Sequence, residues 1–245
     1  MNTPVRISII IPTLQEEALI SRTLAQFTPE LRRRYAMEII VSDGGSTDRT
    51  TGLACPAADR VVCAEPGVRQ TISGGRNAGA AAARGDLLFF FNADVIIEDA
   101  GKFFSIMTNA FGDPRLVAAT CNVNIYPEEA TTTDWIFHNC FNGYFWLLNI
   151  LGMGMGRGEC HVVRRDVFRR IGGYHESIAA GEDYELFLRL RRVGGVKFVR
   201  ELTVFESPRR FRRDGYLRIT LLWFLNGLSV LVAGKSLVDE WKPVR

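Results

Sequence analysis

The sequence predicts an α/β protein whose central sheet is mixed and mainly parallel, with helices on its faces. Short apolar runs rich in β-branched and aromatic residues alternate with segments whose apolar residues recur at helical spacing. Loops rich in glycine, serine and aspartate follow several of these runs. Because strands that alternate with helices pair in parallel through right-handed crossovers, the chain should fold around such a sheet.

The expected strands are apolar runs, of which 87–91 contains only Leu and Phe and should be buried on both faces. They lie at 5–12, where Pro12 should end the strand, and at 38–41, 60–64, 87–91, 116–125, 159–164 and 196–205. The expected helices lie at 16–35 with a break near Pro29, 73–84, 98–111, 135–151, 166–171, 182–193 and 215–233. The glycines of 152–158 predict a flexible loop.

Composition narrows the class of protein. The 245 residues are 47% hydrophobic and 23% charged, which suits one substantial domain, or one domain with a C-terminal extension. A net charge of +3 gives no indication of a nucleic-acid partner. The five scattered cysteines have neither zinc-site nor disulfide spacing, and the first residues lack a secretory signal pattern. We therefore expect a cytoplasmic protein.

The apolar stretch at 219–233 is shorter than the roughly 20 residues that a membrane-spanning helix needs. Five arginines precede or begin it, at positions 209, 210, 212, 213 and 218. The stretch is typical of a buried helix, and a peripheral membrane contact remains an alternative. The aromatic segment 135–151 is typical of a core helix, and a homodimer contact or an acceptor groove are its alternatives.

Polar clusters follow three of the expected strands. They are residues 13–16, Asp43 with its glycines, and Asn92 with Asp94. The carboxyl ends of parallel strands meet at one sheet edge, where α/β proteins bind ligands. Acidic groups that converge there would repel each other unless they bind something, and a nucleotide with a divalent cation satisfies them. Asp94 alone fits a metal ligand or the cap of the helix that follows.

Two further features suit the same ligand. Arg76 starts a Gly/Ala-rich helix and could neutralise phosphate, with glycines beside it that allow close backbone approach. Asp183 lies in the first turn of another helix, whose dipole favours the ionised carboxylate at pH 7. In isolation, Glu182 and Asp183 are also what a helix start typically carries.

The motifs together resemble family 2 glycosyltransferases of the GT-A fold. They are IPTLQE at 11–16, VSDGGSTD at 41–48, GRNAG at 75–79, NAD at 92–94 and GEDYE at 181–185. The later motifs GGY at 172–174 and ESPRRF at 206–211 are similar to those of a bacterial subgroup. The resemblance covers residues 5 to about 206.

The resemblance implies a nucleotide-sugar donor, UDP- or GDP-linked, with Mg²⁺ or Mn²⁺. It implies that the donor is bound by Pro12, Thr13, Glu16, Asp43, Arg76, Asn92 and Ala93. It makes Asp94 the metal ligand and Asp183 the base of an inverting transfer. Asn92 departs from the usual Asp, which removes one negative charge from the site.

Four residues are weaker candidates for the acceptor or the diphosphate: Glu182, His161, Arg209 and Arg210. We expect a GT-A domain over 1–206, with a nucleotide-binding half at 1–126 and an acceptor half at 127–206. Residues 207–245 should form an arginine-rich segment and an apolar helix. The acceptor, lipid-linked or saccharide, stays open.

Two other functions fit parts of the pattern. A sugar-phosphate nucleotidyltransferase would need a glycine-rich loop with a basic residue after the first strand, and 12–16 offers none. A non-catalytic nucleotide-sugar-binding protein is motivated by Asn92. Transfer from a panel of nucleotide sugars would separate these functions.

Overall fold

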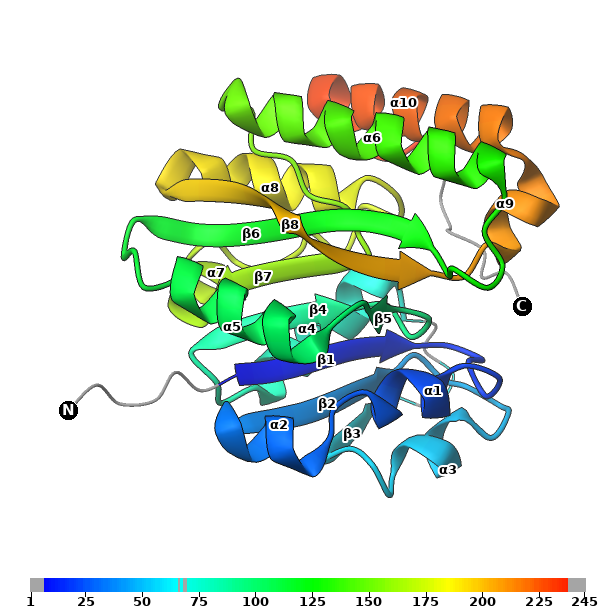
Figure 1. The fold of residues 1–245 in the computed structure, drawn as a ribbon, viewed down its shortest axis with the longest axis vertical. Helices are drawn as coiled ribbons and strands as arrows, with labels where there is room; N and C mark the ends of the chain where they lie inside the picture. The colour runs from blue at the N-terminus through cyan, green and yellow to red at the C-terminus, as the bar shows by residue number, and fades with distance from the viewer. Residues whose placement is uncertain (1–6, 66, 68–69, 238–245) are drawn as a thin grey trace.

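Eight strands form one mixed sheet in the computed structural model, which describes residues 7–65, 67 and 70–237 (Figure 1). Their order across the sheet is β3-β2-β1-β4-β7-β6-β8-β5. The strands are β1 Ile7–Thr13, β2 Met37–Asp43, β3 Arg60–Cys63, β4 Leu87–Phe91, β5 Ile96–Ile97, β6 Leu116–Ile125, β7 Cys160–Arg164 and β8 Gly195–Glu206. Four of the seven neighbouring pairs are parallel, which confirms the mixed, mainly parallel sheet.

Ten helices connect the strands in the described part of the chain. They are α1 Ile20–Ala25, α2 Pro29–Arg34, α3 Thr50–Ala54, α4 Ile72–Ala82, α5 Ala100–Ala110, α6 Thr132–Ile150, α7 Arg165–Arg170, α8 Glu182–Val193, α9 Arg209–Asp214 and α10 Tyr216–Ala233. The break expected near Pro29 is confirmed, because Pro29 is the first residue of α2 and Thr28 caps it. The sequence did not predict α3, α9 or β5, each of which is very short.

The first strand continues past the residue that was expected to end it. Pro12 pairs with Ser42 and Thr13 with Asp43 in the register of β1 and β2. The pairing of β1 with β4 ends at Ile10, so Pro12 has a strand neighbour on one side only and proline is tolerated there. Residues 5 and 6 of the expected strand lie outside the described residues.

Strand β4 is buried on both faces, as expected. Phe89 and Phe91 pack into the core cluster under α1, α2 and α5. Leu88 and Phe90 face the opposite cluster under α4, α7 and α8. The sheet therefore lies between two helical layers (Figure 1).

Helix α6 covers the part of the sheet formed by β6 and β8, and α10 lies beside α6 in contact with α8 and α9 (Figure 1). Phe145 and Leu148 of α6 pack on Phe198 of β8, and Ile219 of α10 packs with Ile125 at the end of β6. In the part of the chain that the structure describes, no helix has the length and apolar character needed to cross a bilayer.

Strand direction decides which loops meet. Strands β1, β2, β4, β6 and β8 run in one direction, so their carboxyl ends lie at one edge of the sheet. Strand β7 is antiparallel to β4, so its amino end lies at the same edge. The residues before β7 therefore join those after β4, which the sequence alone did not indicate.

Candidate active site

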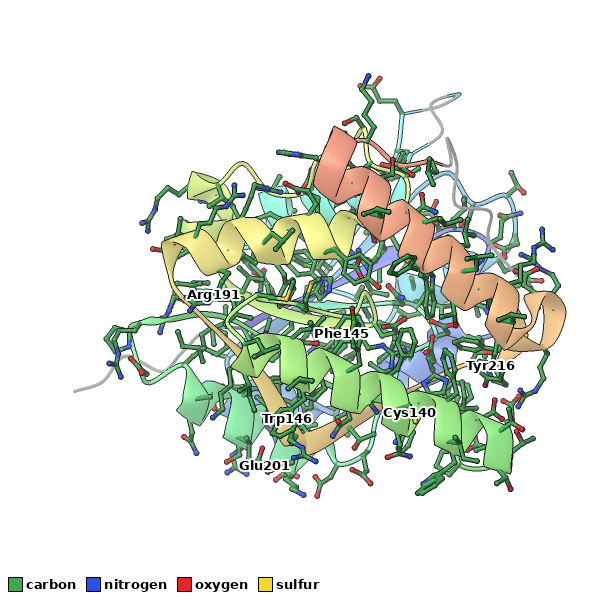
Figure 2. The ribbon with its side chains drawn as sticks, turned by 90° about the horizontal axis from the view of Figure 1, so that it is seen from above. Cys140, Phe145, Trp146, Arg191, Glu201 and Tyr216 are labelled. Atoms are coloured by element: carbon green, nitrogen blue, oxygen red, sulfur yellow. The ribbon has the colours of Figure 1, made fainter. Side chains whose placement is uncertain are left out.

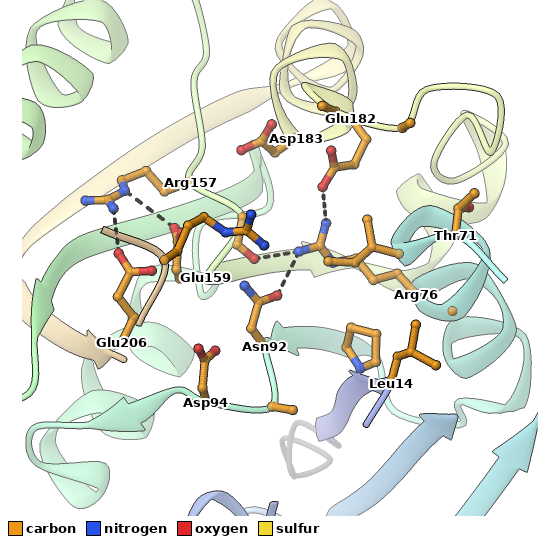
Figure 3. Close-up of a pocket in the computed structure, with 18 of the residues that line it drawn as sticks. Leu14, Thr71, Arg76, Asn92, Asp94, Arg157, Glu159, Glu182, Asp183 and Glu206 are labelled. Carbon is orange, nitrogen blue, oxygen red and sulfur yellow. Dashed lines mark hydrogen bonds and ion pairs between the residues drawn. The ribbon is translucent and has the colours of Figure 1, made fainter. Parts of the chain in front are cut away.

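A cavity of about 440 Å³ opens at this edge of the sheet (Figure 3). The segments after β1, β2, β4 and β8, the start of α4 and the start of α8 line it. Aromatic side chains of α6 and α10, namely Phe141, Phe145 and Trp223, also line it. Eleven of the predicted site residues line the cavity: Pro12, Thr13, Glu16, Arg76, Asn92, Ala93, Asp94, Glu182, Asp183, Arg209 and Arg210.

The loop after β1 is held against the loop after β2 by side-chain hydrogen bonds. Gln15 has a positive φ of 57°, which is costly for a residue other than glycine. Its amide group donates to Thr47 Oγ1 at 2.9 Å and accepts from the Thr47 amide at 2.6 Å. Its backbone amide donates to Ser46 Oγ at 2.8 Å. These contacts compensate the strain and fix one wall of the cavity.

Asp43 lies at the end of β2 and is 2% exposed. Its carboxylate accepts hydrogen bonds from the amides of Gly45 and Ser46 and from the hydroxyls of Ser46 and Thr13. Its neighbours Ser42 and Gly44 line the cavity, whereas Asp43 itself does not. The geometry thus makes Asp43 an organiser of this wall.

Asp94 does not cap the helix that follows. The cap of α5 is Asp99, whose carboxylate accepts from the Lys102 amide at 2.9 Å. The Asp94 backbone carbonyl accepts from the Tyr126 hydroxyl, so the segment after β4 is anchored to the end of β6. The carboxylate is left to face the cavity, which removes the capping alternative.

One guanidinium holds two carboxylates together. Arg209 Nη2 donates to both oxygens of Glu16 at 2.9 Å and lies 3.2 Å from Asp94 Oδ2. Burial raises the pKa of Asp94, and the charge of Arg209 opposes that rise. Arg209 therefore places a positive charge between the carboxylates of Glu16 and Asp94.

Arg76 is 1% exposed and joins three segments of the site (Figure 3). It donates to Glu182 Oε1 at 2.8 Å, Asn92 Oδ1 at 3.0 Å and the Gly158 carbonyl at 2.7 Å. This arrangement shows Arg76 fixing the walls around the cavity. The amide oxygen of Asn92 is thereby engaged by Arg76.

Asp183 begins α8 and projects into the cavity opposite Asp94 in the close-up (Figure 3). The turn into the helix relies on Gly181, whose φ of 84° favours glycine. Burial raises the pKa of Asp183 to about 8, and the charges of Glu182 and Glu159 add to the rise. The expectation that the helix start keeps this carboxylate ionised at pH 7 is therefore wrong for the ligand-free protein, because desolvation outweighs the helix dipole.

Three charged residues of the cavity were missed as site residues. Arg157 Nη2 lies 3.1 Å from Glu206 Oε1, and Arg157 Nε lies 3.4 Å from Glu159 Oε2 (Figure 3). Burial raises the pKa of Glu206 well above its usual range, and Glu159 adds to this. Glu159 precedes β7 and Glu206 ends β8, so the rule that polar residues gather at one sheet edge would have found them had the direction of β7 been known.

His161 lies beneath the cavity and not in its lining. It is fully buried on β7, with Nδ1 2.7 Å from the Tyr174 hydroxyl. Burial and the nearby Arg76 hold the pKa of His161 well below its usual range. A neutral, packed imidazole in this place supports the wall, so the geometry offers it no contact with an acceptor in the cavity.

Comparison with known proteins agrees with this geometry. The sequence model of "Glycosyl transferase family 2" matches residues 8–172, so the chain belongs to that family. A probable glycosyltransferase of Bacillus subtilis, YdaM, is 23% identical over 205 residues, covering 77% of this chain and 47% of YdaM. A validoxylamine A glucosyltransferase of Streptomyces hygroscopicus subsp. limoneus is 31% identical over 93 residues, covering 37% of this chain and 20% of that protein. The chain thus spans about half or less of the curated relatives it matches.

Solved structures confirm the GT-A fold. The mannosyltransferase PcManGT of Pyrobaculum calidifontis, in complex with GDP-mannose and Mn²⁺, has a TM-score of 0.66 at 18% identity, covering 88% of this chain and 63% of that one. The glucosyl-3-phosphoglycerate synthase of Mycobacterium tuberculosis, with Mn²⁺, UDP and phosphoglyceric acid, has a TM-score of 0.62 at 17% identity, covering 94% and 78%.

Proposed function

We propose that this protein is an inverting, metal-assisted glycosyltransferase that moves a sugar from a UDP- or GDP-linked donor to an acceptor hydroxyl or phosphate. The observation that carries the proposal is the cavity itself, which sets the Asp94 carboxylate on one wall and the Asp183 carboxylate on another. The GDP-mannose complex of PcManGT and a UDP-glucose complex of the glucosyl-3-phosphoglycerate synthase support the choice of donor.

On the donor side, Pro12, Thr13, Glu16, Asn92 and Ala93 would border the nucleotide. Asp43 would shape this wall from behind, through the hydrogen bonds that fix the loop after β2. Arg209 and Arg210 line the cavity next to the two donor-side carboxylates and would take the diphosphate, because Arg pairs well with phosphate oxygens. Arg76 would hold Asn92 and Glu182 in place.

The carboxylate oxygens that line the cavity fit Mg²⁺ or Mn²⁺ when the ion arrives bound to the nucleotide. Among the described residues, no group of three or more His, Cys, Asp and Glu side chains is able to hold an ion. Ions that accompany nucleotides are typically held by one or two carboxylates and the phosphates, which Asp94 satisfies. Solved neighbours hold Mn²⁺ or Mg²⁺ with UDP. When bound, the ion would neutralise charge on the leaving diphosphate.

On the acceptor side, Asp183 would take the proton of the attacking group. A carboxylate whose pKa is about 8 is a stronger base than an ordinary one. One base suffices for direct displacement at the anomeric carbon, which inverts its configuration. Two carboxylates lie at the start of α8. Among the described residues, Glu182 is paired with Arg76, and Asp183 is the one that forms no ion pair.

The proposal also includes the domain division, the subgroup, the location and the type of acceptor. Residues 1–126 would form the nucleotide-binding half and 127–206 the acceptor half, with 207–245 closing the site. Of these, residues 1–6, 66, 68–69 and 238–245 lie outside the described residues. The ESPRRF segment at 206–211, which contributes Glu206, Arg209 and Arg210 to the cavity, would mark the bacterial subgroup. A cytoplasmic location and a lipid-linked or saccharide acceptor belong to the same proposal.

The test is a panel of UDP-, GDP- and dTDP-sugars incubated with the full chain, Mn²⁺ and a set of acceptors. We expect release of the nucleoside diphosphate from one donor class. The NMR signal of the anomeric proton should show that the product has the inverted anomeric configuration relative to the donor. A retained configuration would overturn the inverting mechanism. Donor binding without any turnover would favour a non-catalytic binding protein.

The metal assignment has a test of its own in Asp94→Ala. We expect this variant to lose the Mn²⁺-dependent part of nucleoside diphosphate binding, measured by calorimetry with and without EDTA, because the one cavity carboxylate assigned to the ion is removed. The matched control is Asp99→Ala, which removes the α5 cap and should lower stability by about 0.5–2 kcal/mol while leaving Mn²⁺-dependent binding intact. Unchanged Mn²⁺ dependence in Asp94→Ala would refute the assignment.

A further inference from the structure

The outer sides of α6 and α10 carry most of the large apolar side chains that the protein exposes. Of fourteen such side chains in the described part of the chain, twelve lie within residues 135–153 and 217–228. We name these twelve the apolar face. Exposed apolar residues scattered singly need no explanation, whereas residues gathered on neighbouring helices indicate an interaction surface.

The apolar face follows helical spacing on α10. Leu217, Leu221, Phe224 and Leu228 are separated by four, three and four residues and so lie along one side of the helix. Their exposed fractions are 85%, 56%, 65% and 49%. The inner side of the same helix is buried against the protein, where Ile219 packs on the core. In the described part of the chain, the outer side of α10 is therefore largely open to solvent.

On α6, Ile136, Leu147 and Ile150 form a corresponding stripe, exposed by 52%, 48% and 60%. A side chain at Gly143, between them, would meet no atom within 4 Å, so the space over the helix is open. The two helices are joined on their inner sides, where the rings of Phe141 and Trp223 lie 5.7 Å apart. Seen from above, both helices lie on the same surface of the molecule (Figure 2).

The charges at the two ends of α10 are mainly positive. Helix α10 contains one charged residue, Arg218, and the single acid of α6, Asp134, is 1% exposed and paired with Arg212. Arg212 and Arg213 are half-exposed beside the start of α10, where Asp214 pairs with Arg213, and Lys235 is exposed beyond the end of the helix. Among the described residues, both ends of α10 are therefore basic.

We propose that the apolar face docks on an anionic lipid surface, with the basic residues at the ends of α10 contacting lipid headgroups. Helices that lie in a membrane interface combine Leu, Phe and Trp on one side with flanking Lys and Arg. A second copy of this chain is the weaker occupant. Pairing α10 with its copy brings cations onto cations in either orientation, because Arg218 and Lys235 lie at its two ends.

Docking would also orient the cavity. Phe141 and Trp223, on the inner sides of the two helices, line one part of the cavity. The docked protein therefore holds that part of the cavity next to the bilayer, in reach of an acceptor in the membrane. Vesicle binding requires neither donor nor acceptor, so its failure and the failure of the proposed transferase activity are separate results.

The test is co-sedimentation of the full chain with vesicles of phosphatidylcholine alone and of equal parts phosphatidylcholine and phosphatidylglycerol. We expect the protein to bind the anionic vesicles and to bind the neutral vesicles at least about tenfold more weakly. Added salt should reverse the binding to the anionic vesicles. The double variant Leu221→Ser and Phe224→Ser should lose most of the binding. Arg213→Gln with Arg218→Gln should lower it by roughly fivefold per charge removed.

Two matched controls lie elsewhere on the surface. Val193→Ser alters an apolar side chain that is 46% exposed at the end of α8, and Arg170→Gln alters an exposed arginine on α7, so both should bind as the wild type does. Absence of binding to anionic vesicles would overturn the proposal. So would a dimer in sedimentation velocity that Leu221→Ser with Phe224→Ser converts to a monomer, which would assign the apolar face to a second copy.

Discussion

At the scale of single residues, the environment of Asp183 matters more than its place on a helix. A helix start typically stabilises an ionised carboxylate by about 0.3–1 kcal/mol. In the folded protein, burial first and then the charges of Glu182 and Glu159 raise the pKa of Asp183 to about 8 instead. The ligand-free carboxyl is therefore mainly protonated at neutral pH, and the form that accepts a proton grows as the pH rises.

The upward shift in the pKa of Asp183 predicts how the rate of transfer depends on pH. We expect kcat/KM to rise about tenfold per pH unit below about pH 8 and to level off above it, since kcat/KM reports the free enzyme. The variant Glu159→Gln should move this rise to lower pH, because one of the charges that raise the pKa of Asp183 is removed. The profile is measured with a saturating Mn²⁺ concentration and a fixed donor.

The matched control for that shift is Glu176→Gln, a carboxamide change on a residue that does not line the cavity, which should leave the profile in place. A rate independent of pH across this range, or a profile that Glu159→Gln does not move, would contradict the role of Asp183.

At the scale of elements, helix α9 links the C-terminal segment to the donor side of the cavity. The link is Arg209, which bridges Glu16 after β1 and Asp94 after β4. A guanidinium in this place competes with any other cation for Asp94. Binding of a metal–nucleotide complex at Asp94, as proposed, would therefore require Arg209 to leave that carboxylate, and the diphosphate would offer Arg209 new partners.

The variant Arg209→Gln tests this competition. We expect Mn²⁺ alone to bind more tightly than to the wild type, because Asp94 and Glu16 lose their shared positive charge. We expect the nucleoside diphosphate to bind more weakly, because an arginine that would contact it is gone. Both affinities are measured by calorimetry. Arg213→Gln, which breaks only an exposed pair with Asp214, is the control. Equal Mn²⁺ affinity in Arg209→Gln and wild type would rule the competition out.

Helix α4 carries Arg76 and depends on a close approach to β1. A Cβ at Gly79 would lie 2.5 Å from Ile10 Cγ2, in a fully buried part of the core. We expect Gly79→Ala to lower the free energy of unfolding by about 1–3 kcal/mol, because the β-branched Ile10 has no room to move. Urea denaturation followed by circular dichroism measures the change.

The control for this overpacking is Gly52→Ala in α3, where an added Cβ meets nothing within 4 Å. It should leave stability unchanged or raise it by up to about 1 kcal/mol, since Gly is a poor helix former. A neutral Gly79→Ala would show that α4 can shift away from β1.

At the scale of the whole molecule, strongly patterned segments were predictable. The bounds expected for β4, β6 and α8 are those observed, because long apolar runs and a clear helical period dominate each of them. Convergence of Glu16 and Asp94 on one cavity also followed from the expected parallel direction of their strands, whereas the place of Asp183 in the site was expected only from the family resemblance.

Other features depend on tertiary structure and could not be predicted. Pairs such as Arg76 with Glu182 or Arg209 with Glu16 join residues more than a hundred positions apart. The direction of β7, which brings Glu159 to the site, is set by the pairing with β4 and leaves no local signal. The raised pKa of Asp183 follows from burial, which depends on the packing of α10 and α6 around α8.

The central claim is that Asp183 is the base of a metal-assisted transfer. The most direct measurement compares Asp183→Asn with the wild type for donor binding in Mn²⁺ and for single-turnover sugar transfer. We expect unchanged donor affinity and a transfer rate lower by at least about 10²–10⁴-fold, because Asn keeps the shape but cannot accept the proton. Asp166→Asn, on the exposed side of α7, should transfer normally. Transfer by Asp183→Asn at the wild-type rate would contradict the claim.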